Sequence, residues 1–405
     1  MKQEQCHELI KDTKNLTKFA SLKPRPVDIM SVTVKIVQNR RDLRKFVDFP
    51  NRLYKGNEFY VPGLFMDEMD TLDPKKNPAY EFSSAELYLA YKDGELVGRV
   101  AAIINTKANE SWKHDEVRYG WFDFIDDKEV SGALIDAVVA YGKKHGMTSI
   151  AGPLGFTDFD PEGMLVEGYD QIGTFPLIYN YPYYVKHMED MGFEKVVDWL
   201  EYKIFFTDEI PARIERVSRI VLEKYGVRVR KVTRREVRKE QIGRKIFDLI
   251  NRTYCNLFDF TILTDKLVDK YVDTYLGLLD LEFVTIIEDR EGKIVGMGIT
   301  MPSIVHAMQK CRGRLFPFGW YHLLKSMYFK YEEAIELLLI AVEPEWMNRG
   351  LNALLIKDMI PRASKRGFVY AETNAELENN SNVQSQWSDF RTEQHKRRRV
   401  YGKKI

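Results

Sequence analysis

The chain has little cysteine, almost no net charge and no long apolar run, and each of these features excludes a class of protein. Its 405 residues include three cysteines, and Cys6, Cys255 and Cys311 lie far apart without a CxxC pair or a histidine cluster. Neither a disulfide framework nor a zinc site is therefore expected, and the cytoplasm is the predicted location. Lys and Arg number 61 against 60 Asp and Glu, so no overall field attracts nucleic acid or a membrane.

No apolar stretch approaches the roughly 20 residues of a membrane-spanning helix. Residues 1–30 are polar and have no apolar core of the kind found in a secretory signal, so we expect a polar tail there, with Met30 as an alternative start to Met1. The hydrophobic fraction of 44% is typical of a soluble globular protein. The length suits two domains of roughly 150 to 200 residues each.

Segments of the second half repeat segments of the first, roughly 200 residues earlier. Each half has a strand, a polar turn with glycine and a second strand, followed later by an amphipathic helix and a short apolar strand. A third pair is formed by Asn180 and Asn380, each of which has aromatic residues after it. The matched ranges are 91–102 with 289–300, 133–146 with 353–367, and 148–151 with 368–371.

This order of elements predicts an α/β (α+β layered) architecture with two tandem domains. Each domain should hold a mixed, mostly antiparallel sheet flanked by helices. The predicted boundaries are 31–207 for the first domain and 208–405 for the second.

The stretch from 334 to 356 carries the clearest chemical signal. An apolar strand over 334–342 is followed by a tight polar loop, and a helix is expected to begin at the end of that loop. The first backbone N–H groups of a helix have no partner within the helix and lie at the positive end of its dipole, so they bind phosphate. Gly350 allows close approach of a diphosphate to the backbone, and Arg349 adds a charged donor.

These residues resemble the acyl-CoA-binding loop of the GNAT superfamily of N-acetyltransferases. The match is Met347-x-x-Gly350-x-Asn352, preceded by Val342-x-Pro344, and it departs from the family pattern at Met347 and Asn352. The resemblance implies a tandem GNAT fold that uses acetyl-CoA or another acyl-CoA as co-substrate, without a metal. The residues implied to hold that co-substrate are Ile340, Val342, Met347, Asn348, Arg349, Gly350, Leu351, Asn352, Asn380 and Trp387.

The same resemblance implies a catalytic base. In the histone acetyltransferase branch a glutamate lies eleven residues before the first motif position, which here is Glu336. A carboxyl group on an apolar strand should have a raised pKa, although we favour the alternative that Glu336 is a strand-edge residue paired with Lys or Arg. The tyrosine that protonates the departing thiolate in the family is replaced by Trp387, and Tyr401 is a distant substitute.

The first copy lacks a phosphate loop at the corresponding place. Asp126, Asp127 and Glu129 stand at the expected helix start, where they would repel a diphosphate, so we expect no coenzyme A there. The insertion at 152–179 carries Asp158, Asp160 and Glu162. It begins like a calcium loop, but position 12 is occupied by Tyr169, so the acids face either an amine substrate or solvent.

Two further segments have alternative interpretations. The aromatic stretch 315–329 could line an acyl pocket, lie on a membrane, or form a helix packed on the core, and we expect the last of these. The basic stretch 395–404 is expected to be a closing strand with solvated side chains rather than an RNA-binding tail.

The predicted function is transfer of an acyl group from acyl-CoA to the amine of a small molecule or peptide, with no nucleic-acid partner. Two alternatives stay open. One is an aminoacyl-tRNA-dependent, FemX-like transferase, and the other is a binding protein that has lost catalysis.

Overall fold

The computed structural model describes residues 32–207, 209–275, 279–329 and 332–405. The predicted polar tail at 1–30, with both proposed starts and Cys6, lies outside the described residues. The elements of the first half are β1 (Thr33–Ile36), α1 (Arg40–Leu53), α2 (Phe65–Thr71), η3 (Pro78–Glu81), β2 (Ser83–Lys92), β3 (Glu95–Asn105), α3 (Thr106–Trp112), β4 (Glu116–Phe124), α4 (Lys128–Lys144), β5 (Ser149–Gly152), β6 (Met164–Glu167), α5 (Tyr183–Asp190) and β7 (Glu194–Phe205).

The second half repeats this order with additional helices. Its elements are α6 (Ala212–Tyr225), β8 (Arg228–Arg230), α7 (Arg234–Lys239), α8 (Ile242–Tyr254), α9 (Asp265–Tyr275), η4 (Leu281–Phe283), β9 (Val284–Glu288), β10 (Ile294–Pro302), α10 (Val305–Cys311), α11 (Gly319–Leu324), η5 (Lys325–Phe329), β11 (Ala334–Val342), η6 (Pro344–Trp346), α12 (Leu351–Lys365), β12 (Tyr370–Thr373), β13 (Glu376–Leu377), α13 (Ser381–Gln384), η7 (Ser385–Trp387) and β14 (Arg391–Lys404).

The strands form one mixed, mostly antiparallel sheet. Its order is β1-β2-β3-β4-β5-β14-β7-β12-β11-β10-β9-β8, with β6 and β13 attached beside β14 and β7. Reading inward from either edge, the fourth and fifth strands are parallel and the other neighbours are antiparallel. The sheet thus repeats the same arrangement from both ends, which confirms the predicted fold class and its two-domain organisation.

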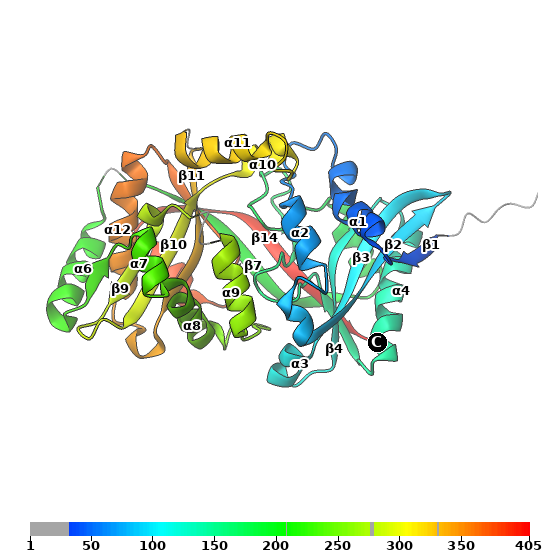
Figure 1. Ribbon diagram of the computed structural model, residues 1–405, viewed down its shortest axis with the longest axis horizontal. Coiled ribbons are helices and arrows are strands. Elements are labelled where there is room, and N and C mark those ends of the chain that lie inside the picture. Colours follow the sequence, from blue (N-terminus) through cyan, green and yellow to red (C-terminus); the bar gives the residue numbers. More distant parts are fainter. Residues whose placement is uncertain (1–31, 208, 276–278, 330–331) are drawn as a thin grey trace, which may run out of the picture.

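The two halves exchange their last strands. Gly152 of β5 pairs with Tyr401 of β14, and Tyr370 of β12 pairs with Phe205 of β7. β7 and β14 pair with each other in the middle of the sheet. Figure 1 shows β14 crossing between the two lobes, so that the carboxyl terminus lies beside α4 in the first half. The sheet is therefore continuous across the predicted boundary at 207, which stays a prediction.

Helices of the two halves also share a hydrophobic core. The largest cluster of buried side chains includes Phe46 of α1 and Ala101 of β3, and also Leu249 of α8. α2 and α9 face each other at the centre of Figure 1, where the Tyr275 hydroxyl donates a hydrogen bond to Asp67 at 2.9 Å. Burial of this apolar surface against the other half holds the two lobes together.

The basic carboxyl-terminal stretch forms a strand, as predicted, but the prediction of solvated side chains is wrong for Lys396 and Arg398. Lys396 and Arg398 are each 1% exposed. The Lys396 ammonium lies 2.7 Å from the Glu372 carboxylate on β12, and Arg398 binds Glu201 on β7. A buried cation needs such an acid partner. The partners lie on other strands and far away in the sequence, so local composition could not indicate them.

Candidate active site

The candidate site lies where two parallel strands of the second half diverge. Pairing of β11 with β12 runs from Ala334 to Leu337 and ends there. One residue further along, β11 contains a bulge opposite Ile299 and Thr300 of β10. A bulge bends and twists a strand, and here it directs the end of β11 away from β12. The backbone on both sides of the resulting gap faces a cavity rather than a neighbouring strand.

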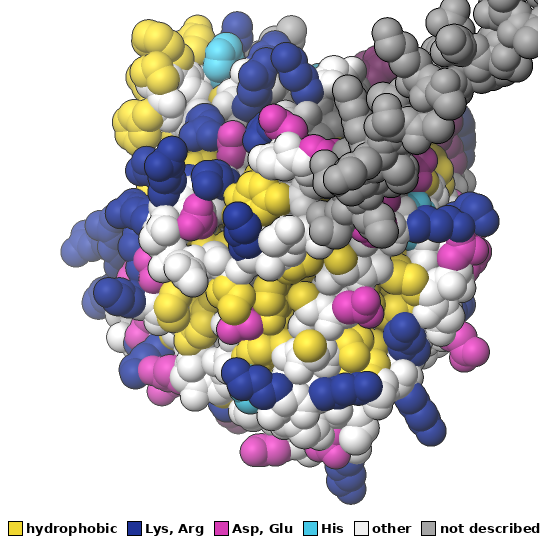
Figure 2. Space-filling model, turned by 90° about the vertical axis from the view of Figure 1, so that its right-hand side faces the viewer, with side chains coloured by type: hydrophobic (Ala, Val, Ile, Leu, Met, Phe, Trp, Pro, Cys, Tyr) yellow, Lys and Arg dark blue, Asp and Glu magenta, His cyan; other side chains and the backbone are white. Residues whose placement is uncertain are grey.

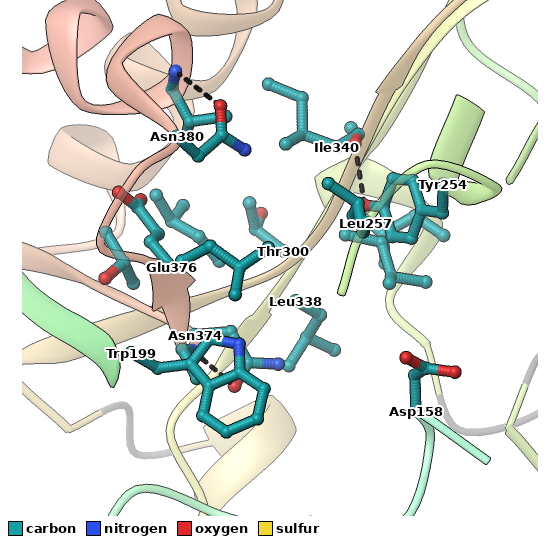
Figure 3. Close-up of a pocket in the computed structure, with 18 of the residues that line it drawn as sticks. Asp158, Trp199, Tyr254, Leu257, Thr300, Leu338, Ile340, Asn374, Glu376 and Asn380 are labelled. Atoms are coloured by element: carbon teal, nitrogen blue, oxygen red, sulfur yellow. Dashed lines mark hydrogen bonds between the residues drawn. The ribbon is translucent and has the colours of Figure 1, made fainter. Parts of the chain in front are cut away.

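The cavity has a volume of about 280 Å³ and mostly apolar walls. Its floor and sides come from β10, β11, α12 and the loop after α8, together with residues of the first half. Figure 3 shows Ile340 and Tyr254 on one side of this space and Glu376 and Asn380 on the other. The Tyr254 hydroxyl donates a hydrogen bond to the Ile340 carbonyl at 2.8 Å, which ties α8 to the free part of β11.

Glu376 supplies a carboxyl group to one wall. It follows β12 at the start of β13, and the Trp387 indole N–H donates to its Oε1 at 3.1 Å. The other oxygen, Oε2, has no hydrogen-bond partner among the described residues. Burial raises the pKa of Glu376 to about 7, against the lowering effect of the Trp387 hydrogen bond. A carboxyl group with such a pKa exchanges protons efficiently near neutral pH.

The opposite end of the cavity is acidic. Asp158 and Glu162, from the insertion of the first half, line it together with Asp160. Burial raises the pKa of Asp158 and of Glu162. The negative charge of Asp259 raises the pKa of Asp158 further, and that of Asp158 raises the pKa of Glu162. Arg118, which pairs with Asp259 at 2.7 Å, acts in the opposite direction on both. An ammonium group placed here would favour the ionised form of these carboxyl groups.

Two acids of the calcium-like pattern in this insertion accept hydrogen bonds from backbone N–H groups. Asp160 Oδ2 accepts hydrogen bonds from the backbone N–H groups of Phe156 and Thr157, at 2.8 and 3.1 Å. Asp158 accepts one from the backbone N–H of Thr261, at 3.0 Å, which attaches the loop to the second half. Of the two interpretations made from the sequence, the structure places these acids at the cavity rather than in solvent.

Glu336, the predicted base, lies outside the cavity lining. It is 1% exposed, and it sits beside Glu372 across the β11–β12 pair. Neither carboxyl oxygen has a hydrogen-bond partner of good geometry among the described residues, although Ser303 lies close enough to act weakly. Burial, and next the negative charge of Glu372, raise the pKa of Glu336 well above its usual range. A catalytic role for Glu336 stays a prediction.

The predicted phosphate loop has the expected local structure. β11 ends at Val342, and α12 begins at Leu351 behind Gly350, which has φ +84° and provides no side chain to cap the helix. A Cβ at Gly350 would lie 2.7 Å from Val217 of α6, so helix packing also requires glycine there. The Arg349 guanidinium stacks on Trp346, 5.0 Å from the ring centroid.

The predicted site residues fall into three groups. Ile340, Asn380 and Trp387 line the cavity. The loop and helix start hold Met347, Asn348, Arg349, Gly350, Leu351 and Asn352, and Val342 packs under α6 with Leu351. The lining also includes Leu355 on the second turn of α12, and at a rise of 1.5 Å per residue this is about 6 Å along the helix from Leu351. The cavity therefore reaches close to the helix start.

One cluster has the residue types of a metal site. Ligand atoms of Glu201, Glu372 and His395 lie within 4.8 Å of one another. The Lys396 ammonium lies 2.7 Å from Glu372 and 3.4 Å from Glu201, and so occupies the place that a cation would take. Burial and then the charge of Lys396 lower the pKa of His395 to about 3, so the imidazole is neutral. The cluster is an internal ion pair at the junction of the two halves.

Comparison with known proteins identifies the fold. No family model matches the chain. A tandem GNAT protein from the clavulanic acid biosynthesis pathway aligns with a TM-score of 0.53 and 11% identity, over 92% of this chain and 98% of that one. The chain has a tandem GNAT fold. A fungal multi-domain beta-N-acetylglucosaminidase with a GCN5-related glucosamine N-acetyltransferase region aligns at a TM-score of 0.52 and 12% identity, over 93% of this chain and 38% of that one.

Two curated proteins are similar to this chain over nearly its whole length. Protein YghO of Escherichia coli (strain K12) is 28% identical over 380 residues, which are 92% of this chain and 95% of the relative. The bacterial ceramide synthase of Caulobacter vibrioides is 25% identical over 374 residues, 91% of this chain and 96% of the relative. Both similarities span the two halves together.

Sequence reasoning missed two side chains of this site. Glu376 and Tyr254 line the cavity, yet neither belongs to a motif. Tyr254 ends a helix that comes roughly 85 residues before β11 in the chain, so only the fold brings it to Ile340. Glu376 lies four residues before Asn380, which the sequence did indicate, and a carboxyl group that close to a predicted site residue was the available signal.

Proposed function

We propose that the chain is an acyl-CoA-dependent N-acyltransferase whose acceptor is an amine with a long hydrocarbon chain. The observation that carries the proposal is the cavity between the diverging strands β11 and β12, which reaches close to the start of α12 and has acids at its far end. The relative named bacterial ceramide synthase supports the acceptor class, since a ceramide is the N-acyl derivative of a long-chain amino alcohol.

The donor end of the site would use the start of α12. Its first backbone N–H groups have no side-chain cap, and they lie at the positive end of the helix dipole, so they suit the diphosphate of coenzyme A. The extended arm of the thioester would then follow the unpaired part of β11, in the way that a peptide adds to a strand edge. Leu338, Leu339 and Ile340 form that part of the wall.

The acids supply recognition and proton transfer. Asp158 and Glu162 attract the acceptor as an ammonium ion, which releases one proton to solvent before its nitrogen reaches Glu376. The neutral nitrogen attacks the thioester carbonyl, and Glu376 takes a proton from it as the C–N bond forms. The C–S bond then breaks, giving an amide and a thiol. Glu376 gives that proton to the departing sulfur and ends unchanged, which fits a carboxyl group with a pKa of about 7.

The test pairs a series of donors with a panel of acceptors. Acetyl-, lauroyl- and palmitoyl-CoA are incubated with sphinganine, glucosamine and a short peptide, and the release of free thiol is measured together with the mass of any N-acyl product. We expect amide formation with sphinganine and a long-chain acyl-CoA. Glu376→Gln, which keeps the acceptor oxygen for Trp387, should bind the same donor without turnover.

Three outcomes would contradict the proposal. Failure of every acyl-CoA to bind in calorimetry removes the donor, and transfer from aminoacyl-tRNA in its place would favour the FemX-like alternative. Binding of acyl-CoA without turnover on any amine would favour the alternative in which catalysis has been lost. Turnover with glucosamine or the peptide but not with sphinganine would retain the reaction and overturn the acceptor class.

A further inference from the structure

A helical cap formed by α10, α11 and η5 covers one edge of the second half, along the top of Figure 1. Its inner side is apolar and buried, since Met308, Leu323 and Met327 pack with Val61 and Met301. The sequence-based expectation that this stretch packs on the core is thus confirmed for its inner side. Its outer side differs from that expectation.

The outer side of the cap exposes large aromatic side chains. Phe316 is 80% exposed, Phe329 is 83% exposed and Trp320 is 46% exposed. Nearly half of the exposed large hydrophobic side chains among the described residues lie in this short stretch. Such a concentration on one surface marks an interaction site rather than ordinary scatter. We name it the aromatic face, and it consists of Phe316, Phe318, Trp320, Tyr321, Leu324, Tyr328 and Phe329.

The charged side chains of the cap itself have one sign, and two acids of neighbouring segments pair with it, Asp48 with Arg314 and Glu332 with His306. The sequence contains no Asp or Glu between Glu291 and Glu332, although the chain as a whole is balanced. Lys310, Arg312 and Lys325 are exposed beside the aromatic side chains. In Figure 2, hydrophobic side chains gather at the upper edge, at the height where Figure 1 places the cap, and Lys and Arg side chains lie beneath them.

This combination fits the surface of a lipid bilayer. Trp and Tyr rings prefer the boundary between headgroups and acyl chains, while Lys and Arg bind anionic headgroups. Within the described part of the chain, no helix combines the length and the apolar character that crossing a bilayer requires. We propose that the aromatic face binds the surface of a bilayer that contains anionic phospholipid.

The aromatic face lies next to the candidate active site. Leu338 packs against the buried side of the cap and also lines the cavity. Phe175 packs against the same cluster, and Leu177, two residues further on, lines the cavity as well. Docking on a bilayer would therefore bring the cavity close to substrates dissolved in it. This last step rests on the proposed function, whereas membrane binding itself does not.

Vesicle flotation tests the binding. Full-length protein is mixed with vesicles of phosphatidylcholine alone or of phosphatidylcholine with phosphatidylglycerol. We expect the wild type to float with the anionic vesicles and to release in high salt, because salt screens the contribution of Lys and Arg. The double variant Phe316→Ser with Phe329→Ser should bind at least about tenfold more weakly, since each ring loses its burial in the acyl region.

A matched control removes exposed apolar side chains elsewhere. Ile220 and Ile262 are 48% and 50% exposed on the second half outside the cap. The double variant Ile220→Ser with Ile262→Ser should bind vesicles like the wild type. A second measurement uses brominated phospholipid, which should quench a fluorescence component that disappears in Trp320→Phe.

Three results would overturn the proposal. They are a wild type that floats with neither vesicle, an aromatic-face variant that binds as well as the wild type, and a control variant that loses binding equally. Self-association through the face without vesicle binding would identify a second copy of the chain as the occupant instead. Vesicle binding without any acyl transfer would retain this proposal and contradict only the proposed function.

Discussion

The corresponding helices of the two halves, α4 and α12, begin in opposite ways. In the first half Asp127 caps α4, with its side chain accepting from the Glu129 N–H at 2.9 Å, and Lys92 binds both carboxylates. In the second half Gly350 stands at the cap position of α12 and offers no side chain. A helix start that already holds its own carboxylates repels a phosphate, whereas a start without a side-chain cap leaves the positive end of the helix dipole unopposed by a cap.

The space beside the parallel strand pair also differs between the halves, since it is filled in the first half and open in the second. In the first half the Leu154 N–H bonds the Tyr119 carbonyl at 2.9 Å, and Trp121, at φ +45°, and Phe156 pack together at 5.9 Å. The cavity left near Trp121 is about 70 Å³, against about 280 Å³ in the second half. The gap is thus filled in the first half and open in the second, which supports the proposal that the ligand binds beside β11.

The largest expected effect is the loss of kcat when the buried acid of the second-half cavity is replaced, compared with replacement of the buried acid of the first-half cavity. Burial raises the pKa of Glu68 in the first half to about 7, the same value as for Glu376 in the second. Glu376→Gln should lower kcat by about 10²- to 10⁴-fold, the usual contribution of a general base. Glu68→Gln should leave kcat within about twofold of the wild type. Steady-state kinetics of both variants, after a check of their folding by circular dichroism, decides whether the closed half takes part in the chemistry.

The same experiment bears on Glu336. If the base is Glu336, its Gln variant and not that of Glu376 should show the large loss in kcat. Equal small losses in the two variants would mean that neither carboxyl group moves a proton in the slow step.

The pH dependence should report the open half alone. With a pKa of about 7, Glu376 is protonated below that pH and cannot accept a proton. At saturating acceptor, where recognition by Asp158 and Glu162 is complete, kcat should therefore rise about tenfold per pH unit up to about 7 and then level off. This rise with pH, the acidic limb of the profile, should vanish in Glu376→Gln and persist in Glu68→Gln. A limb of unchanged midpoint in Glu376→Gln would assign the titration to another group, such as the acceptor amine.

The third prediction transfers a feature of the closed half to the open one. Asn352 is the second residue of α12, and Glu129 is the second residue of α4. Asn352→Glu should raise the Kd for acyl-CoA by at least about tenfold, because a like charge about 8 Å from a phosphate costs about 2 kcal/mol at an effective dielectric of 20. The variant should fold normally, since a negative side chain at a helix start interacts favourably with the helix dipole.

Calorimetry with acyl-CoA measures this effect, and Asn352→Gln is the neutral control. If both variants bind acyl-CoA as tightly as the wild type, the diphosphate does not bind at the start of α12. Equal weakening in both would show that the amide of Asn352, rather than the added charge, matters.

Local patterns in the sequence predicted the elements that depend on near neighbours. Glycine turns marked the hairpins, and the strand, loop and helix around Gly350 lie where they were expected. The exchange of β7 and β14 joins residues far apart in the chain, and strand pairing over such a distance leaves no local sign. Trp387 was predicted at the site, but its partner Glu376 was not, because its one local sign, a position four residues before Asn380, belongs to no motif.

The smallest effect concerns what holds each helix start in place. Asp127→Ala removes a cap from α4 and should lower the free energy of unfolding by about 1 kcal/mol, the usual contribution of such a cap. Asn352→Ala should change it by less than about 0.5 kcal/mol, because α12 has no side-chain cap to lose. Urea denaturation of both variants measures the difference. Similar losses would mean that Asn352 also supports its helix, so that the open start of α12 would be kept for stability and not for a ligand.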